Sequence, residues 1–158
     1  KNNLESLNKV NFNKVVVFLE NISNPGNLGS IIRTCDWFGL NTIVCSENSV
    51  DIYNPKVIQS SMGSLSRVNV VYSSTDLFLS LINKKKLIKL VADLEGENVF
   101  SMSSISSGVL FFGNESKGIS EKIEKHNFKK ITIPQKISNC ESLNLSVSFG
   151  IILSKLLK

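Results

Sequence analysis

The chain has 158 residues, of which 42% are hydrophobic and 20% are charged. This length and balance fit one folded domain and exclude a disordered or multi-module protein. Eighteen basic against 13 acidic side chains give a formal net charge of +5, which favours an anionic partner but also suits a lysine-rich surface.

Neither a membrane span nor a secretory leader is visible in the sequence. No apolar run approaches the ~20 residues that cross a bilayer, and no charged leader precedes an apolar segment. We therefore expect a soluble, cytoplasmic protein. Cys35, Cys45 and Cys140 are widely spaced and the only histidine is His126, so we expect no disulfide framework, no metal site, and buried reduced thiols.

Apolar runs alternate with segments of helical periodicity along most of the chain. The predicted strands span residues 15–19, 42–45, 68–72, 87–94, 109–112 and 131–133. The predicted helices run from about residue 28 to Gly39, from 55 to 61 behind an Asn54 cap, from 75 to 82, and from 120 to 126.

This alternation predicts an α/β domain, a mostly parallel sheet covered by helices on both faces. The domain covers residues 14–158. Residues 1–13 form a polar lead-in, which is compatible with the remnant of an amino-terminal extension or domain.

The last segment allows two interpretations. Residues 142–149 alternate between polar and apolar side chains, which is the periodicity of a strand, whereas residues 151–157 follow a helical pattern. The residues alone leave both structures open.

Three polar loops rich in turn residues adjoin predicted strands. They are residues 24–33, residues 112–119, and Ile133-Pro134 together with residues 141–144. Ligands of open α/β sheets bind at the carboxyl ends of the strands, so we expect one shared site. None of the loops has the G-x-G-x-x-G order or the P-loop ending, which disfavours a nucleotide-binding oxidoreductase.

Single residues in these loops are ambiguous. Arg33 follows Asn27 by six residues on a predicted helix, so it can project near the loop or form an ordinary surface ion pair. Glu115 suits a functional carboxylate and equally an acidic residue at a helix N-terminus. Only the combination of loops indicates a function.

In order and in chemistry, the loops resemble the three motifs of the SpoU (TrmH-like) 2'-O-ribose RNA methyltransferases of the SPOUT superfamily. The matching segments are Asn24-Pro25-Gly26-Asn27 through Arg33-Thr34, then residues 112–118, then Ile133-Pro134 with residues 142–147. The resemblance extends from about Val15 to Leu157, which is nearly the whole chain.

The resemblance implies a deep trefoil knot in the carboxy-terminal part of the domain, which the periodicity alone does not suggest. It also implies that the last segment is a helix that starts near Ser142. This helix and the knot region would be buried against a second subunit, because members of the family are usually homodimers.

For the site, the resemblance implies that S-adenosylmethionine is held largely by main-chain groups of Gly113, Ile133 and Leu143. It also implies catalytic roles for five side chains, which are Asn27, Arg33, Glu115, Ser142 and Asn144.

Arg33 would be the catalytic arginine of the family. A guanidinium stays protonated in nearly all protein settings, so we interpret it as a clamp for a substrate phosphate and a stabiliser of the forming alkoxide rather than a base. Asn27 and Asn144 would orient Arg33, Ser142 would hold the third motif or the substrate, and Glu115 would fix its loop or contact the nucleotide.

The function implied is methyl transfer to a ribose 2'-hydroxyl of tRNA or rRNA. A non-catalytic knotted RNA-binding protein is the alternative, and the intact set of five side chains argues against it. Basic residues available to RNA phosphates are Arg67, Lys84, Lys85, Lys86, Lys89, Lys129 and Lys130. The run Lys84-Lys85-Lys86 is most simply interpreted as the charged end of a helix, where it suits the helix macrodipole. Residues 135–141 depart from the family pattern, since they lack the glycine that is usual there.

Overall fold

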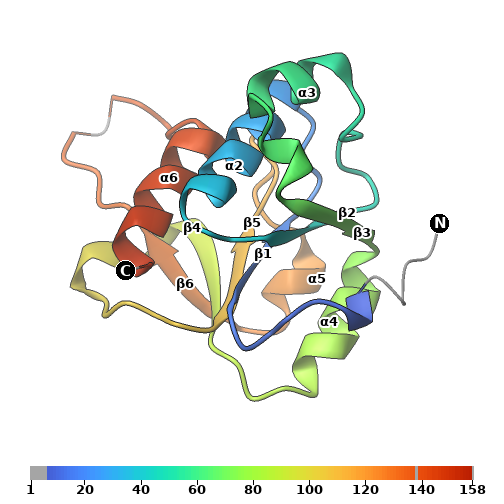
Figure 1. Ribbon diagram of the computed structural model, residues 1–158. Coiled ribbons are helices and arrows are strands. Elements are labelled where there is room, and N and C mark those ends of the chain that lie inside the picture. The colour runs from blue at the N-terminus through green and yellow to red at the C-terminus, as the bar shows by residue number, and fades with distance from the viewer. Residues whose placement is uncertain (1–6, 138, 158) are drawn as a thin grey trace.

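The computed structural model describes residues 7–137 and 139–157, which form a six-stranded parallel sheet with helices against both faces (Figure 1). The sheet order is β3-β2-β1-β5-β4-β6. The strands are β1 (Val15–Leu19), β2 (Thr42–Ser46), β3 (Asn69–Ser73), β4 (Lys89–Asn98), β5 (Gly108–Phe112) and β6 (Lys129–Thr132). The helices are α2 (Pro25–Trp37), α3 (Pro55–Ser61), α4 (Thr75–Asn83), α5 (Glu121–Glu124) and α6 (Leu145–Leu156). The predicted α/β class is confirmed.

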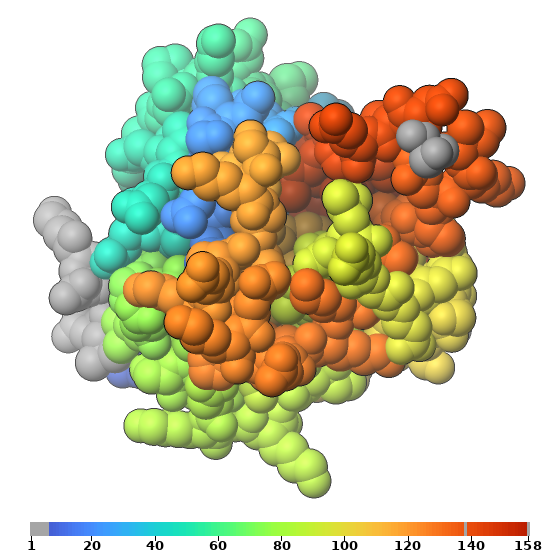
Figure 2. Space-filling model, turned by 180° about the vertical axis from the view of Figure 1, so that it is seen from behind, coloured from blue at the N-terminus to red at the C-terminus, as the bar shows by residue number. Residues whose placement is uncertain are grey.

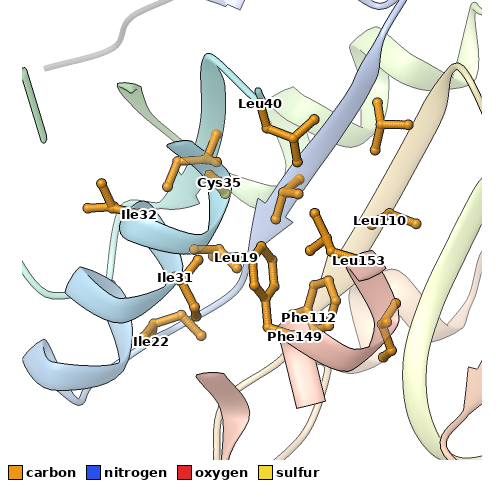
Figure 3. Close-up of a cluster of buried hydrophobic side chains, with 14 of the residues drawn as sticks. Leu19, Ile22, Ile31, Ile32, Cys35, Leu40, Leu110, Phe112, Phe149 and Leu153 are labelled. Atoms are coloured by element: carbon orange, nitrogen blue, oxygen red, sulfur yellow. The ribbon is translucent and has the colours of Figure 1, made fainter. Parts of the chain in front are cut away.

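The central strand β1 is buried along its whole length because its alternate side chains enter two different cores. Val17 and Leu19 pack in the core beneath α2, α3 and α6, part of which is drawn in Figure 3. Val16 and Phe18 enter the second core, which α4 and α5 cover. The apolar run that predicts this strand therefore serves both faces of the sheet.

Aromatic rings fill the second core. Phe18 stacks on Phe78 of α4 with ring centroids 4.5 Å apart, and Phe111 of β5 lies 5.6 Å from Phe18. Leu7 and Val10 of the expected lead-in are buried in the same core, so this part of it packs on the domain. Residues 1–6 lie outside the described residues.

α6 replaces the strand that the alternation at residues 142–149 suggests. The side chain of Asn144 caps the helix by accepting from the Ser146 N–H at 2.9 Å, and Phe149, Ile152 and Leu153 then bury one helical face. The helix implied by the resemblance is therefore confirmed, and the strand interpretation is wrong. It begins at Leu145, three residues after the expected start near Ser142.

Three smaller differences concern β4, α5 and the cysteines. The strand predicted at residues 87–94 extends to Asn98 as β4, with a register shift between Ala92 and Glu97 where it pairs with β6. The helix predicted at residues 120–126 is shorter, since α5 has only four residues. Cys35 and Cys45 are buried as expected, and burial raises the pKa of the Cys45 thiol to about 12. Cys140 is exposed, so burial was the wrong expectation for a residue in the loop after β6.

The length and apolar character of the helices bear on the expectation that no segment spans a membrane. Within residues 7–137 and 139–157, no helix combines the length and the apolar character needed to cross a bilayer, and the longest, α2, has 13 residues.

Candidate functional site

The loop after β1 delivers Asn27 to the carboxyl edge of the sheet. Asn24 caps α2, with its side-chain oxygen accepting from the N–H of Gly26 at 2.8 Å and of Asn27 at 3.2 Å. Pro25 occupies the first helical position. Asn27 therefore sits in the first turn, where the residue is only 7% exposed.

The loop after β5, residues 113–120, is closed on itself, and we call it the motif-two loop. Asn114 and Gly118 exchange two backbone hydrogen bonds of 2.9 Å each, and Asn114 Oδ1 accepts from the N–H groups of Ser116 and Lys117. Gly113 has no room for a side chain, since a Cβ there would lie 2.2 Å from the carbonyl carbon of Gly118. This closed loop presents Glu115.

Side-chain amides join the three predicted loops. Asn27 Nδ2 donates to Glu115 Oε1 at 2.9 Å, and Asn27 Oδ1 accepts from Asn144 Nδ2 at 3.0 Å. These contacts connect residues 88 and 117 positions apart in sequence. The expectation that the loops form one site therefore agrees with the geometry. We call Glu115, Asn27 and Asn144 the carboxamide chain.

Donors and acceptors fix the direction of the carboxamide chain. An ionised carboxylate only accepts, so the Asn27 NH₂ group faces Glu115 and its carbonyl oxygen faces Asn144. Asn144 then uses its NH₂ group on Asn27 and its oxygen to cap α6. Each amide therefore has one orientation, and the start of α6 is tied to the start of α2.

Arg33 lies on α2 but outside the carboxamide chain. Six residues of helix correspond to roughly 600° of rotation, which places Arg33 about 120° around the helix from Asn27. Its side chain is exposed, and no hydrogen bond or ion pair to it is formed within residues 7–137 and 139–157. Within the described residues, neither Asn27 nor Asn144 forms the expected hydrogen bond with Arg33. The guanidinium is therefore open to solvent.

The remaining predicted site residues differ in burial. Gly113 is buried, Ile133 is half-buried against the first core, and Leu143 is 49% exposed just before α6. Ser142 is exposed, and its backbone oxygen accepts from the Cys140 thiol at 3.1 Å. Figure 2 shows a hollow between the orange atoms of the motif-two loop and the red-orange atoms that follow β6.

The predicted cofactor residues after β6 offer apolar surface. Ile133 packs partly against the first core, and Leu143 is exposed just before α6. Backbone and apolar groups of this kind suit an organic cofactor held by its edges and apolar surfaces. Among the described residues, no group of three or more His, Cys, Asp or Glu side chains could hold a metal ion.

Sequence reasoning missed the residues that support this arrangement. Asn114 Nδ2 donates to the backbone oxygen of Asn21 at 2.8 Å, and Ser23 Oγ donates to Glu115 Oε2 at 3.4 Å. Glu20 directly follows β1 and is buried. One sequence signal could have identified Glu20 as a site residue, since it is a charged residue directly after a five-residue apolar run.

A model of the SpoU rRNA Methylase family matches residues 14–154. The chain is 30% identical over 141 residues to an uncharacterized tRNA/rRNA methyltransferase of Archaeoglobus fulgidus, covering 87% of this chain and 62% of that protein. It is 27% identical over 139 residues to the 23S rRNA (guanosine(2553)-2'-O)-methyltransferase RlmP of Bacillus subtilis, covering 87% of this chain and 55% of that protein. It thus spans less than two thirds of the length of either relative.

Among solved structures, the SpoU methyltransferase AviRb from Streptomyces viridochromogenes, in complex with the cofactor AdoMet, is similar in fold. The TM-score is 0.86 at 26% sequence identity, and the match covers 98% of this chain and 63% of that chain.

The carboxamide chain predicts an unusual response to Asn27→Asp. The new carboxylate would face Glu115, and two adjacent carboxylates repel, so we expect a loss of about 1–3 kcal/mol in the free energy of unfolding at pH 7.5. Protonation of one of the two carboxyls relieves the repulsion, so we expect a smaller loss at pH 5 than at pH 7.5.

Urea unfolding at both pH values measures this effect. Asn24→Asp is the control, because the Asn24 side chain accepts from backbone N–H groups and a carboxylate caps a helix equally well. Equal stability of the two variants at pH 7.5 would contradict the assigned amide directions.

Proposed function

Because the chain belongs to the SpoU rRNA methylase family, we propose that it transfers a methyl group from S-adenosylmethionine to a ribose 2'-hydroxyl of tRNA or rRNA. The observation that carries this proposal is the carboxamide chain, which brings all three motifs to one edge of the sheet. The names of the relatives support both RNA classes and do not choose between them.

The cofactor supplies an electrophilic methyl group, and this chain supplies the pocket. In the proposal, main-chain groups of Gly113, Ile133 and Leu143 hold S-adenosylmethionine in the hollow of Figure 2. The tight contact of Gly113 with Gly118 supports this assignment, because it fixes the backbone that the cofactor would read. The similarity to AviRb, solved with AdoMet, supports it as well.

Arg33 is the catalytic residue of the proposal. Its exposed guanidinium clamps a phosphate next to the target ribose and stabilises the negative charge that develops on the 2'-oxygen. Ser142, also exposed, contacts the substrate or holds the third motif. Asn27, Glu115 and Asn144 act as positioning residues, because they fix the helix that carries Arg33 without touching its side chain.

The ion pairs divide the candidate RNA-binding residues into two groups. Arg67 binds Asp36 through Nε and Nη2, Lys129 pairs with Glu97 at 2.6 Å, and Lys130 pairs with Asp93 at 2.8 Å. Hydrogen bonds from Arg67 lower the pKa of Asp36, which keeps this exposed pair charged. These three basic residues already have anionic partners.

Lys84, Lys85 and Lys86 form the second group, and they follow α4. All three are exposed, and within the described residues none forms an ion pair. Lys85 Nζ lies 5.2 Å from the centre of the Phe12 ring. We therefore assign phosphate contacts to these lysines, together with Lys89, in preference to the paired residues.

We also propose that residues 14–158 are the catalytic domain, and that this domain is knotted and dimeric. A trefoil knot is supported by the segment between β4 and β5, whose Ile105 N–H donates to the Leu156 oxygen at the end of α6. A homodimer through α6 and the knot region is supported by the exposed apolar side chains of Trp37, Leu143 and Val147. We place the reaction in the cytoplasm, where its RNA substrates are made.

Binding and turnover test the activity separately. We expect calorimetric titration to show S-adenosylmethionine binding, and methyl transfer to appear with total tRNA or rRNA. No binding would contradict the proposed function, and binding without transfer would favour the non-catalytic alternative.

Arg33→Ala and Arg33→Lys should each lower kcat by at least about 10²-fold and change cofactor affinity little, because neither retains the bidentate fork. Methyl incorporation and calorimetry measure the two effects. Lys56→Gln, which alters an exposed cation of α3, is the control. Retained turnover in Arg33→Lys would rule out the bidentate clamp.

Replacing Lys84, Lys85 and Lys86 together by Gln should weaken RNA binding and lower the slope of log affinity against log salt by about 2–3, since each phosphate contact contributes roughly 0.7–0.9. Filter binding at several salt concentrations measures the slope. Lys129→Gln, at a paired site, should change it by less than about one. An unchanged slope in the triple variant would remove these lysines from the interface.

A crystal structure of the chain tests the architecture. We expect residues 133–157 to be threaded through the chain between β4 and β5, and α6 to face its symmetry mate together with Trp37. An unthreaded carboxy-terminus, or α6 exposed in a monomer, would refute the corresponding part.

A further inference from the structure

Glu20 is a buried carboxylate that the proposed reaction does not use. It directly follows β1 and is 1% exposed. No Lys, Arg or His forms an ion pair with it among the residues that the structure describes. Burying such a group is costly unless hydrogen bonds replace its water.

Three donors satisfy the Glu20 carboxylate, and they come from two places. Thr75 Oγ1, at the start of α4, donates to Oε1 at 3.0 Å. Ser120, at the end of the motif-two loop, donates to the same Oε1 through its hydroxyl at 2.7 Å and to Oε2 through its backbone N–H at 2.7 Å. One carboxylate therefore joins β1, α4 and the motif-two loop.

The next residue, Asn21, holds the opposite end of the same loop. Its backbone oxygen accepts from Asn114 Nδ2 at 2.8 Å. Its backbone N–H donates to Ser46 Oγ of β2 at 2.7 Å. The two residues that follow β1 thus contact both ends of the motif-two loop.

Between these ends, the motif-two loop has little freedom to adjust. Gly113 packs so closely on Gly118 and Ile119 that a Cβ would lie within 2.4 Å of both residues. Asn114 and Gly118 are paired in both directions. The loop should therefore move as a unit, so that a displacement of Ser120 also displaces Gly113 and Glu115.

We propose that Glu20 is a positioning residue for cofactor binding: by holding Ser120, it keeps the motif-two loop in the conformation that receives the cofactor. The inference rests on the proposed function for the identity of the ligand. It assigns to Glu20 a role separate from that of the carboxamide chain, which holds Glu115 through Asn27.

The structure offers a matched pair of variants that tests this role. Ser120→Ala and Thr75→Val each remove one hydroxyl donor to Glu20 Oε1, but only Ser120 belongs to the motif-two loop. A merely structural role predicts equal effects of the two variants. The positioning role predicts that they lower the melting temperature by similar amounts and differ in cofactor binding.

Calorimetry with S-adenosylmethionine measures the difference. We expect Ser120→Ala to raise the Kd about tenfold and the KM for the cofactor in parallel, with kcat changed less than about twofold. We expect Thr75→Val to change the Kd less than about twofold. Equal Kd values for the two variants would overturn the inference.

Hydrogen exchange gives a second measurement that needs no ligand. Amides of residues 113–120 should exchange faster in Ser120→Ala than in the wild type, and remain as protected in Thr75→Val as in the wild type. Equal protection in both variants would overturn the inference. Failure of the wild type to bind S-adenosylmethionine would instead refute the proposed function, and the exchange comparison would still decide whether Ser120 holds the loop.

Replacement of Glu20 itself completes the test. Glu20→Gln should weaken cofactor binding more than Ser120→Ala does, because it weakens all three hydrogen bonds and puts an NH₂ group among donors. Glu20→Asp should restore part of the affinity, since it retains the carboxylate. If Glu20→Gln does not fold, the Ser120 and Thr75 pair decides alone.

Discussion

The site depends on the amide of Asn27, which donates to Glu115 and accepts from Asn144 at the same time. A hydroxyl is too short to bridge the same gap, and an ionised carboxylate has no donor, so few side chains could join these two partners. Both bonds are possible because parallel pairing places the carboxyl ends of β1 and β5 side by side and because α6 returns across the sheet to α2. The contact therefore needs β1 and β5 to be in register, although its partners are only three residues.

Packing on both faces provides that register. Alternate residues of β1 enter separate cores, so a slip of one residue would exchange the two sets and place Phe18 where Val17 now packs. The loops at the carboxyl edge also contribute to this packing, with Ile22 in the first core and Ile119 against the second. Further order comes from helix caps, such as Asn24 and Asn144, and from the internal pairing of the motif-two loop.

Much of the fold follows from local patterns. The bounds of β1 and α3 agree with the prediction because an apolar run and an Asn-Pro cap are local signals. The alternation at residues 142–149 predicts the wrong element because serines separate its apolar residues, whereas burial of Phe149 with Ile152 and Leu153 favours a helix. The loops that converge could be predicted from their place after strands. The absence of a partner for Arg33 among the described residues could not, because it depends on which side chains the fold brings to the helix surface. The proposed role of Glu20 could not be predicted either, because Thr75 and Ser120 become its neighbours only in the folded chain.

The lysines after α4 lie at the amino edge of the sheet, beside Phe12 and the start of β4, whereas Asn27 lies at the opposite edge. Five residues of β5 separate these edges by about 16 Å. An RNA that contacts both edges therefore has to span at least this distance. The length of the strands would then set a minimum size for the RNA, and shorter oligonucleotides would contact one edge without the other.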